Sequence, residues 1–142
     1  MQGEVHVWRV ALDRADDMLA RLGSTLSDDE RARGERFRSE RDRARFLVSR
    51  AALRAILSRY AGRPAAALAF LAGPHGKPSL AGAGAIEFNL SHSGDLALVA
   101  VAAGVRVGVD VEQLREMDDR DAIVRRFFSA REQAELFALP GP

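Results

Sequence analysis

Residues 86–112 read IEFNLSHSGDLALVAVAAGVRVGVDVE and contain three short runs in which apolar residues dominate. The runs are 86–91, 96–101 and 105–111, and each has the length and alternation typical of a β-strand. The turns that join them are too short for a parallel crossover connection. The stretch therefore predicts a three-stranded antiparallel β-meander.

Helical patterns lie on both sides of this predicted meander. Ser27 and Glu30 have the spacing of a capping box, and Ser39 with Asp42 offers a second cap, so the segment up to Tyr60 predicts two helices or one kinked helix. A helix over 13–22 and strands over 5–10 and 68–71 complete the N-terminal part, and a further capping box at 129–132 opens a C-terminal helix. The order predicts an α+β fold in which helices cover one face of the sheet.

Composition limits the class of protein. The chain has 142 residues, the length of one ordinary domain, with 47% hydrophobic and 29% charged residues. A formal net charge of +1 gives no bulk field for nucleic acid or a membrane surface, and the lack of cysteine excludes disulfides and thiolate metal sites. With no signal-peptide pattern and no long apolar run, we expect a soluble, cytoplasmic protein with neither nucleic-acid nor membrane partners.

Two carboxylates stand in the last predicted strand, although aspartate is uncommon in strands. Strand periodicity places Asp110 and Glu112 on one side, about 6–7 Å apart, with the valines of 105–111 on the other side toward the core. Carboxylates at this spacing are able to share a hard cation such as Mg²⁺ together with phosphate oxygens and water. A solvated outer strand face is the alternative interpretation.

Polar residues also cluster at the end of the first meander strand and in the preceding loop. Ser91 and His92 are sequence neighbours, so their side chains diverge and a nucleophile–base pair is not expected. His92 has the chemistry to donate to an anion, or it is an ordinary turn histidine. Lys77, the only lysine against 20 arginines, lies between glycine and proline and is suited to a phosphate, although such turns are common.

The segment 31–59 contains ten arginines. Six acidic residues between Asp28 and Asp42 indicate that most of these arginines form surface ion pairs. Guanidinium groups also bind phosphate in a bidentate manner, so a subset of them suits a polyphosphate ligand.

Five motifs in a fixed order give the chain a strong resemblance to the surfactin-type 4′-phosphopantetheinyl transferases. They are SDDERARGERFRSERDRARFLVSRAALRAIL (27–57), HGKP (75–78), FNLSHSG (88–94), GVDVE (108–112) and RRFFSAREQAEL (125–136). The resemblance implies an enzyme that transfers the phosphopantetheine arm of coenzyme A to a serine of an acyl or peptidyl carrier protein and releases 3′,5′-ADP.

The resemblance also implies roles for individual residues. Asp110 and Glu112 would bind Mg²⁺ on the coenzyme A pyrophosphate and count as catalytic residues. The residues that the resemblance implies as coenzyme A contacts are Arg33, Arg41, Lys77, Ser91 and His92. Of these, His92 also counts as a catalytic residue. Glu30 stands where some relatives carry a basic residue.

The family fold consists of two similar halves related by a pseudo-twofold axis, and its second half carries a W-x-x-K-E motif that is absent from these 142 residues. We therefore expect an N-terminal half over 1–113, followed by a linker and the truncated start of the second half over 114–142. Activity is then expected to be incomplete without a C-terminal half, and the expected partners include such a half or a second copy of the chain. The alternatives are a non-catalytic module that binds coenzyme A or another anion, and a basic-helix interaction domain.

Overall fold

The computed structural model describes residues 3–13, 15–73, 77–82, 84–115 and 118–139. Of the quoted motifs, His75 and Gly76 lie outside the described residues. In chain order the elements are β1 (Val5–Ala11), α1 (Ala15–Leu22), η1 (Gly23–Thr25), α2 (Asp28–Gly34), α3 (Glu40–Ala61), η2 (Ala65–Ala67), β2 (Phe70–Ala72), β3 (Pro78–Leu80), β4 (Ile86–Ser93), β5 (Leu96–Ala103), α4 (Arg120–Phe127) and α5 (Ala130–Phe137).

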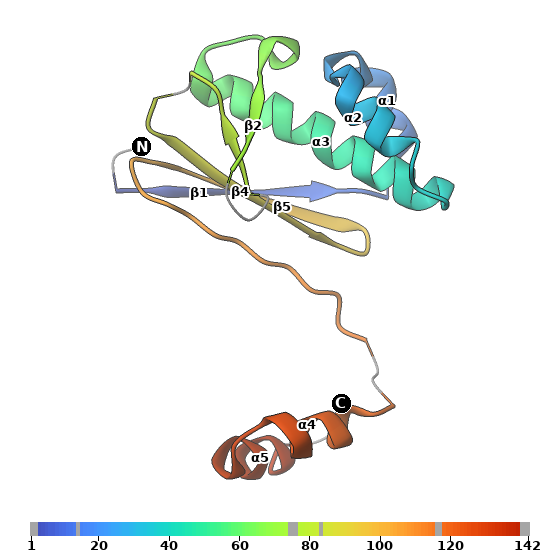
Figure 1. The fold of residues 1–142 in the computed structure, drawn as a ribbon, viewed down its shortest axis with the longest axis vertical. Helices are drawn as coiled ribbons and strands as arrows, with labels where there is room; N and C mark the ends of the chain where they lie inside the picture. Colours follow the sequence, from blue (N-terminus) through green and yellow to red (C-terminus); the bar gives the residue numbers. More distant parts are fainter. Residues whose placement is uncertain (1–2, 14, 74–76, 83, 116–117, 140–142) are drawn as a thin grey trace.

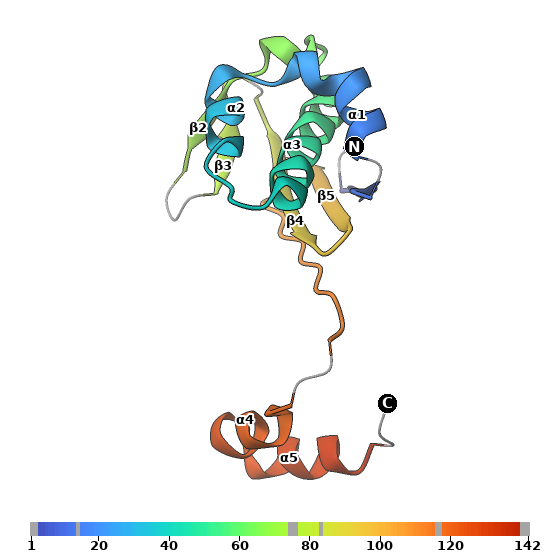
Figure 2. The ribbon, with the colours of Figure 1, turned by 90° about the vertical axis from the view of Figure 1, so that its right-hand side faces the viewer.

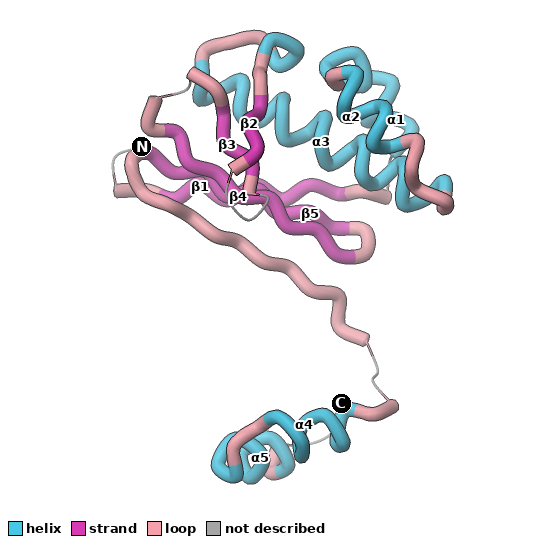
Figure 3. Tube along the Cα trace, in the orientation of Figure 1, coloured by secondary structure: helices cyan, strands magenta, loops and turns pink. Residues whose placement is uncertain are grey.

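The main sheet is antiparallel, with the strand order β1–β5–β4. β4 and β5 form the predicted hairpin, whose turn contains Gly94 at a φ of 57°, a left-handed conformation that suits glycine. The third strand, however, is β1 and not residues 105–111, so this part of the meander prediction was wrong. The two edges of β5 are taken by β4 and β1, and residues after Gly104 therefore leave the sheet and run beneath it (Figures 1 and 3).

Helix α3 covers one face of this sheet, as Figure 2 shows end-on. The capping boxes and caps predicted from the sequence are present: Ser27 and Glu30 cap α2, and Ser39 accepts from the Asp42 amide at the start of α3. The apolar side of α3 meets the inward side chains of the strands in one core, formed by Val10, Leu12, Val48, Ala52, Leu53, Ile56, Leu57, Leu68, Leu80, Phe88, Ala97, Val99 and Val101. The α+β class with helices on one sheet face is confirmed.

A polar contact also fixes β1 to α3. The hydroxyl of Tyr60 accepts from Trp8 Nε1 at 2.7 Å and lies 2.9 Å from His6 Nδ1. Because β1 is an edge strand, this contact adds to its pairing with β5.

The region of the predicted strand 68–71 differs in detail. The strand begins later, as β2, and pairs with β3, which the sequence analysis did not predict. Leu68 is buried in the core instead. Its carbonyl oxygen accepts a bond from Arg54, which holds the chain at this point.

The C-terminal helices α4 and α5 form a pair that lies away from the sheet in both ribbon views (Figures 1 and 2). The predicted capping box at Ser129 and Glu132 is present at the start of α5. Val124 is buried, but Phe127 is 70% exposed.

Candidate functional site

The segment that follows β5 carries Asp110 and Glu112 and lies along β4. It is extended, but it forms no regular ladder of backbone hydrogen bonds within the described residues. Instead, alternate side chains of β4 hold its backbone amides: Asn89 Oδ1 accepts from Val109 N at 2.8 Å, Ser91 Oγ from Val111 N at 3.2 Å and Ser93 Oγ from Gln113 N at 3.0 Å. The three partners are each twenty residues apart in the chain, so the segment runs parallel to β4.

The predicted separation of acids from valines along this segment is present, but the valines do not reach the core. Asp110 and Glu112 are exposed, whereas Val107, Val109 and Val111 are half-buried. None of the three valines belongs to the core between α3 and the sheet. Since Asn89, Ser91 and Ser93 alternate with the core residue Phe88, they face the opposite side of the sheet, and the segment covers that side.

Serine hydroxyls orient both carboxylates. Ser91 Oγ donates to Asp110 Oδ1 at 2.7 Å, and Ser93 Oγ donates to Glu112 Oε2 at 3.2 Å. A carboxylate has about four acceptor positions, so each keeps free positions for a cation. The two exposed carboxylates fit Mg²⁺, which prefers one or two carboxylates with phosphate oxygens and water. Among the described residues, no group of three or more histidine, aspartate or glutamate side chains is suited to hold a metal by itself.

Lys77 contacts the same segment. Its Nζ donates to the carbonyl oxygen of Val107 at 2.7 Å, and its side chain is half-buried. The phosphate contact expected for Lys77 stays a prediction, and the structure places this lysine next to the part of the chain that leads to Asp110. An ammonium group has three donors, so this bond leaves two of them available.

His92 and Ser91 point to opposite faces of β4, as expected for neighbours in a strand. Ser91 faces the carboxylate segment. His92 is exposed, and no hydrogen bond of its ring is found in the described part of the chain. The structure thus brings Ser91 to Asp110 but does not place His92 with them.

The predicted basic contacts lie on the helical side of the fold. Arg33 is exposed on α2, with its guanidinium 5.4 Å from the centre of the Phe46 ring. Arg41, in the first turn of α3, pairs with Asp95 at 3.2 Å, and Arg45 pairs with the same carboxylate. The hydrogen bond and charge of Arg45, together with Arg41, lower the pKa of Asp95.

Among the described residues, ion pairs involve five of the ten arginines in 31–59, which is fewer than the majority expected from the sequence. The paired residues are Arg41, Arg43, Arg45, Arg50 and Arg54.

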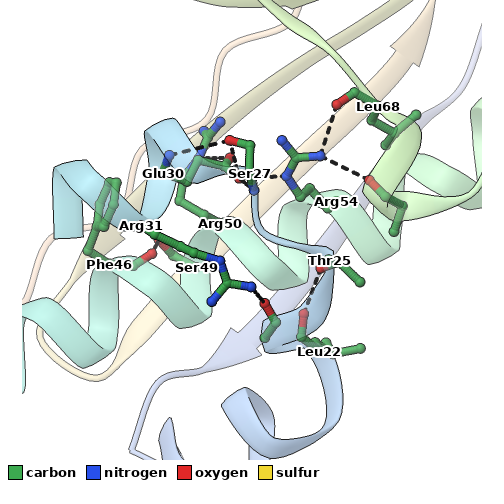
Figure 4. A network of polar contacts seen from close by, with 12 residues as sticks. Leu22, Thr25, Ser27, Glu30, Arg31, Phe46, Ser49, Arg50, Arg54 and Leu68 are labelled. Carbon is green, nitrogen blue, oxygen red and sulfur yellow. Dashed lines mark hydrogen bonds and ion pairs between the residues drawn. The ribbon is translucent and has the colours of Figure 1, made fainter. Parts of the chain in front are cut away.

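The position of Glu30 has a structural explanation. Its side chain is only 9% exposed and lies between Arg50 Nε at 2.8 Å and Arg54 Nε at 2.6 Å (Figure 4). Arg54, whose side chain is 3% exposed, also donates to the carbonyl oxygens of Ala65 and Leu68. Glu30 therefore joins α2 to α3 and is not directed at a ligand.

Electrostatics agree with an ionised Glu30. Burial raises the pKa of Glu30, but the hydrogen bond from the Ser27 amide and the two neighbouring guanidinium groups outweigh burial and lower the pKa overall. The same network fixes α2, the helix that carries Arg33.

A cavity of about 380 Å³ lies beside Glu112 at the end of the β4–β5 hairpin. Its lining joins the carboxylate segment to β1 and consists of Arg9, Ala11, Asp13, Ser93, Asp95, Leu96, Val111, Glu112 and Gln113. A second cavity of about 550 Å³ includes Arg41 and Arg45 and shares Asp13 and Asp95 with the first. Lys77, Ser91 and Arg33 line neither of these cavities.

Ser93 is the residue of this site that sequence reasoning missed. A signal for it exists in the sequence: Asn89, Ser91 and Ser93 alternate in the same way as Val109, Val111 and Gln113. Because the 105–111 stretch was interpreted as a neighbouring strand, its backbone was expected to bond to another backbone and not to side chains.

Comparisons with known proteins show the family of the chain. The family model described as "4′-phosphopantetheinyl transferase, N-terminal" matches residues 13–104. The chain is 41% identical to the 4′-phosphopantetheinyl transferase HetI of Nostoc sp., over 99% of this chain and 60% of that protein. It is 34% identical to the 4′-phosphopantetheinyl transferase psf-1 of Bacillus pumilus, over 94% and 58%, and 27% identical to Sfp of Bacillus subtilis, over 93% and 58%.

The chain therefore belongs to the 4′-phosphopantetheinyl transferase family, and it matches the family's N-terminal part. It spans about 60% of the length of the curated relatives that it matches. Within the described residues, no helix combines the length and apolar character that crossing a membrane requires.

Proposed function

We propose that this chain forms the coenzyme A-binding half of an enzyme that transfers 4′-phosphopantetheine to a serine of an acyl or peptidyl carrier protein. The observation that carries the proposal is the pair of exposed carboxylates, Asp110 and Glu112, each oriented by a serine of β4. Membership of the family supports the reaction class. A cytoplasmic location belongs to the same proposal.

Asp110 and Glu112 would hold Mg²⁺, which when bound supplies positive charge to the pyrophosphate under attack and to the leaving group. The serine oxygen of the carrier forms the new bond to phosphorus and its proton passes to water, while the bond to the bridging oxygen breaks and 3′,5′-ADP leaves. Lys77 lies beside the segment that carries these acids, where its free donors suit a phosphate oxygen.

The remaining coenzyme A contacts in the proposal are Ser91, His92, Arg33 and Arg41. Arg33 and His92 are exposed, and neither has an ion pair within the described residues, so both are free to contact the 3′-phosphate. Arg41 pairs with Asp95 and would have to exchange this partner for phosphate. We therefore assign Arg33 the stronger role of the two arginines.

The direct test is incubation with coenzyme A, Mg²⁺ and an apo carrier protein, followed by mass spectrometry of the carrier. The chain is assayed alone and with the C-terminal half of a relative supplied in trans, because the relatives that it matches are longer. The proposal expects the carrier to gain the mass of phosphopantetheine in at least one of these mixtures. Binding of coenzyme A without a mass gain in either would favour the non-catalytic binding module instead.

A further inference from the structure

The three β4 side chains that hold the carboxylate segment form a regular set, called here the β4 polar row: Asn89, Ser91 and Ser93. Each of them accepts a hydrogen bond from one backbone amide of the segment. The donors are the amides of residues 109, 111 and 113, in the same order along the chain. Because β4 and the carboxylate segment are both extended, alternate side chains of β4 and alternate amides of the segment repeat at the same spacing of about 6.6 Å. The β4 polar row therefore fixes the register of the segment.

The two serines of this row have a second function. A hydroxyl group offers one donor and two acceptor positions. Ser91 and Ser93 each accept from the amide of the residue that follows a carboxylate and donate to that carboxylate itself. Each serine thus sets both the place of the backbone and the direction of one acid.

The orientation of the Glu112 carboxylate depends on its bond to Ser93. Glu112 is exposed, and it has no ion pair among those found within the described residues. Among the described residues, the hydrogen bond from Ser93 to Oε2 is the one that selects an orientation of its carboxylate. Ser93 and Glu112 also line the same 380 Å³ cavity, so a ligand there would meet the carboxylate in this orientation.

We propose that Ser93 is a positioning residue that orients Glu112 toward a divalent cation shared with Asp110. The inference rests on the proposed function, because it takes the two acids as the cation ligands. Ser93 would act through Glu112 without contacting the cation. Partners that orient a metal ligand in this way typically contribute 10- to 100-fold to metal affinity.

The test compares three variants of the full chain. Ser93→Ala removes both the donor to Glu112 and the acceptor for Gln113, while Ser93→Thr keeps a hydroxyl at the same atom position. Ser58→Ala is the matched control, since the Ser58 hydroxyl donates to Ala55 O within α3. The fold should survive the Ser93 variants because the backbone pairing of Ser93 with Leu96 remains.

Two measurements are made on each variant: Mn²⁺ affinity in the presence of coenzyme A, by electron paramagnetic resonance of free Mn²⁺, and hydrogen exchange of the Gln113 amide by NMR. For Ser93→Ala we expect about tenfold weaker Mn²⁺ binding and faster Gln113 exchange. Ser93→Thr should restore both, and Ser58→Ala should change neither. A purely structural role would alter the exchange rate but not the metal affinity.

Each other outcome overturns the inference. If Ser93→Ala binds Mn²⁺ as tightly as the unmodified chain, Ser93 does not orient Glu112 for a cation, whatever happens to the Gln113 amide. If Ser93→Thr fails to restore affinity, the hydroxyl is not the responsible group. If the unmodified chain itself binds no Mn²⁺ with coenzyme A, the proposed function fails along with the inference, and this result is distinct from the other two.

Discussion

Replacement of Glu30 by glutamine should destabilise the fold strongly, although it changes only one side-chain atom. The change removes the negative charge that compensates Arg50 and Arg54, at 2.8 and 2.6 Å. The Arg54 side chain is only 3% exposed and has almost no access to bulk water, whereas Arg50, at 16%, has partial access. The main cost therefore comes from the buried charge of Arg54.

Removal of one partner of a buried ion pair typically costs about 3–5 kcal/mol. We expect the lower end, about 3 kcal/mol, because Arg54 keeps its bonds to the carbonyl oxygens of Ala65 and Leu68 and because the amide oxygen is still able to accept from Ser27. A domain of this size has a total stability of about 5–15 kcal/mol. With a urea m value of about 1.5 kcal/mol/M, the unfolding midpoint should fall by about 2 M.

The assay is urea unfolding followed by circular dichroism, with Glu35→Gln as the matched control. Glu35 pairs with Arg43 on the surface, where loss of the pair should cost no more than about 1 kcal/mol. The Glu30→Gln/Arg54→Met double variant no longer contains the buried charge. Its loss in free energy of unfolding should therefore be at least about 1 kcal/mol smaller than the sum of the losses of the two single variants. A loss below about 1 kcal/mol for Glu30→Gln alone would refute the reasoning.

The same network predicts a pH dependence. The pKa of Glu30 is lowered in the folded state, so its stabilising contribution is complete above the pKa of the unfolded chain, about 4.3, and is lost as the pH falls through the lower folded-state pKa. The difference in free energy of unfolding between the unmodified chain and Glu30→Gln should therefore shrink as the pH is lowered from about 5 to 3. A difference that stays constant over this range would contradict the assignment of an ionised Glu30.

Two further substitutions test other parts of the fold by the same unfolding assay. Tyr60→Phe should lower the free energy of unfolding by about 1 kcal/mol, because Trp8 Nε1 loses its acceptor. It should also shift the fluorescence emission of Trp8, the single tryptophan of the chain, and unchanged emission would contradict the contact. Gly94→Ala should lower the free energy of unfolding by about 1 kcal/mol because Gly94 has a φ of 57°, and Gly94→Asn should lower it by less. Equal losses for the two variants would show that the left-handed backbone conformation is not the cause.

Much of the fold follows from local sequence signals. The caps at Ser27, Ser39 and Ser129 were predictable because each side chain bonds to an amide only three residues away. The β4–β5 hairpin was predictable for the same reason, since its turn is short. The order of the strands was not predictable, because the pairing of β1 with β5 joins residues 85 to 97 positions apart. This pairing occupies the edge of β5 that 105–111 was expected to use.

The candidate site shows the same division. Strand-like alternation correctly placed Asp110 and Glu112 on one exposed side. The contacts that orient them come from Ser91 and Ser93, which are nineteen residues earlier in the chain, and depend on where the segment runs after it leaves the sheet. The burial of Glu30 between Arg50 and Arg54 likewise depends on the packing of α2 on α3, which no local pattern specifies.

The central claim is that Asp110 and Glu112 hold the cation through which the chain binds coenzyme A. Calorimetric titration of coenzyme A, with and without Mg²⁺, into the unmodified chain and into Asp110→Asn tests it most directly. The account predicts that Mg²⁺ tightens binding to the unmodified chain and has no such effect on the variant. An equal gain from Mg²⁺ in both proteins would contradict it.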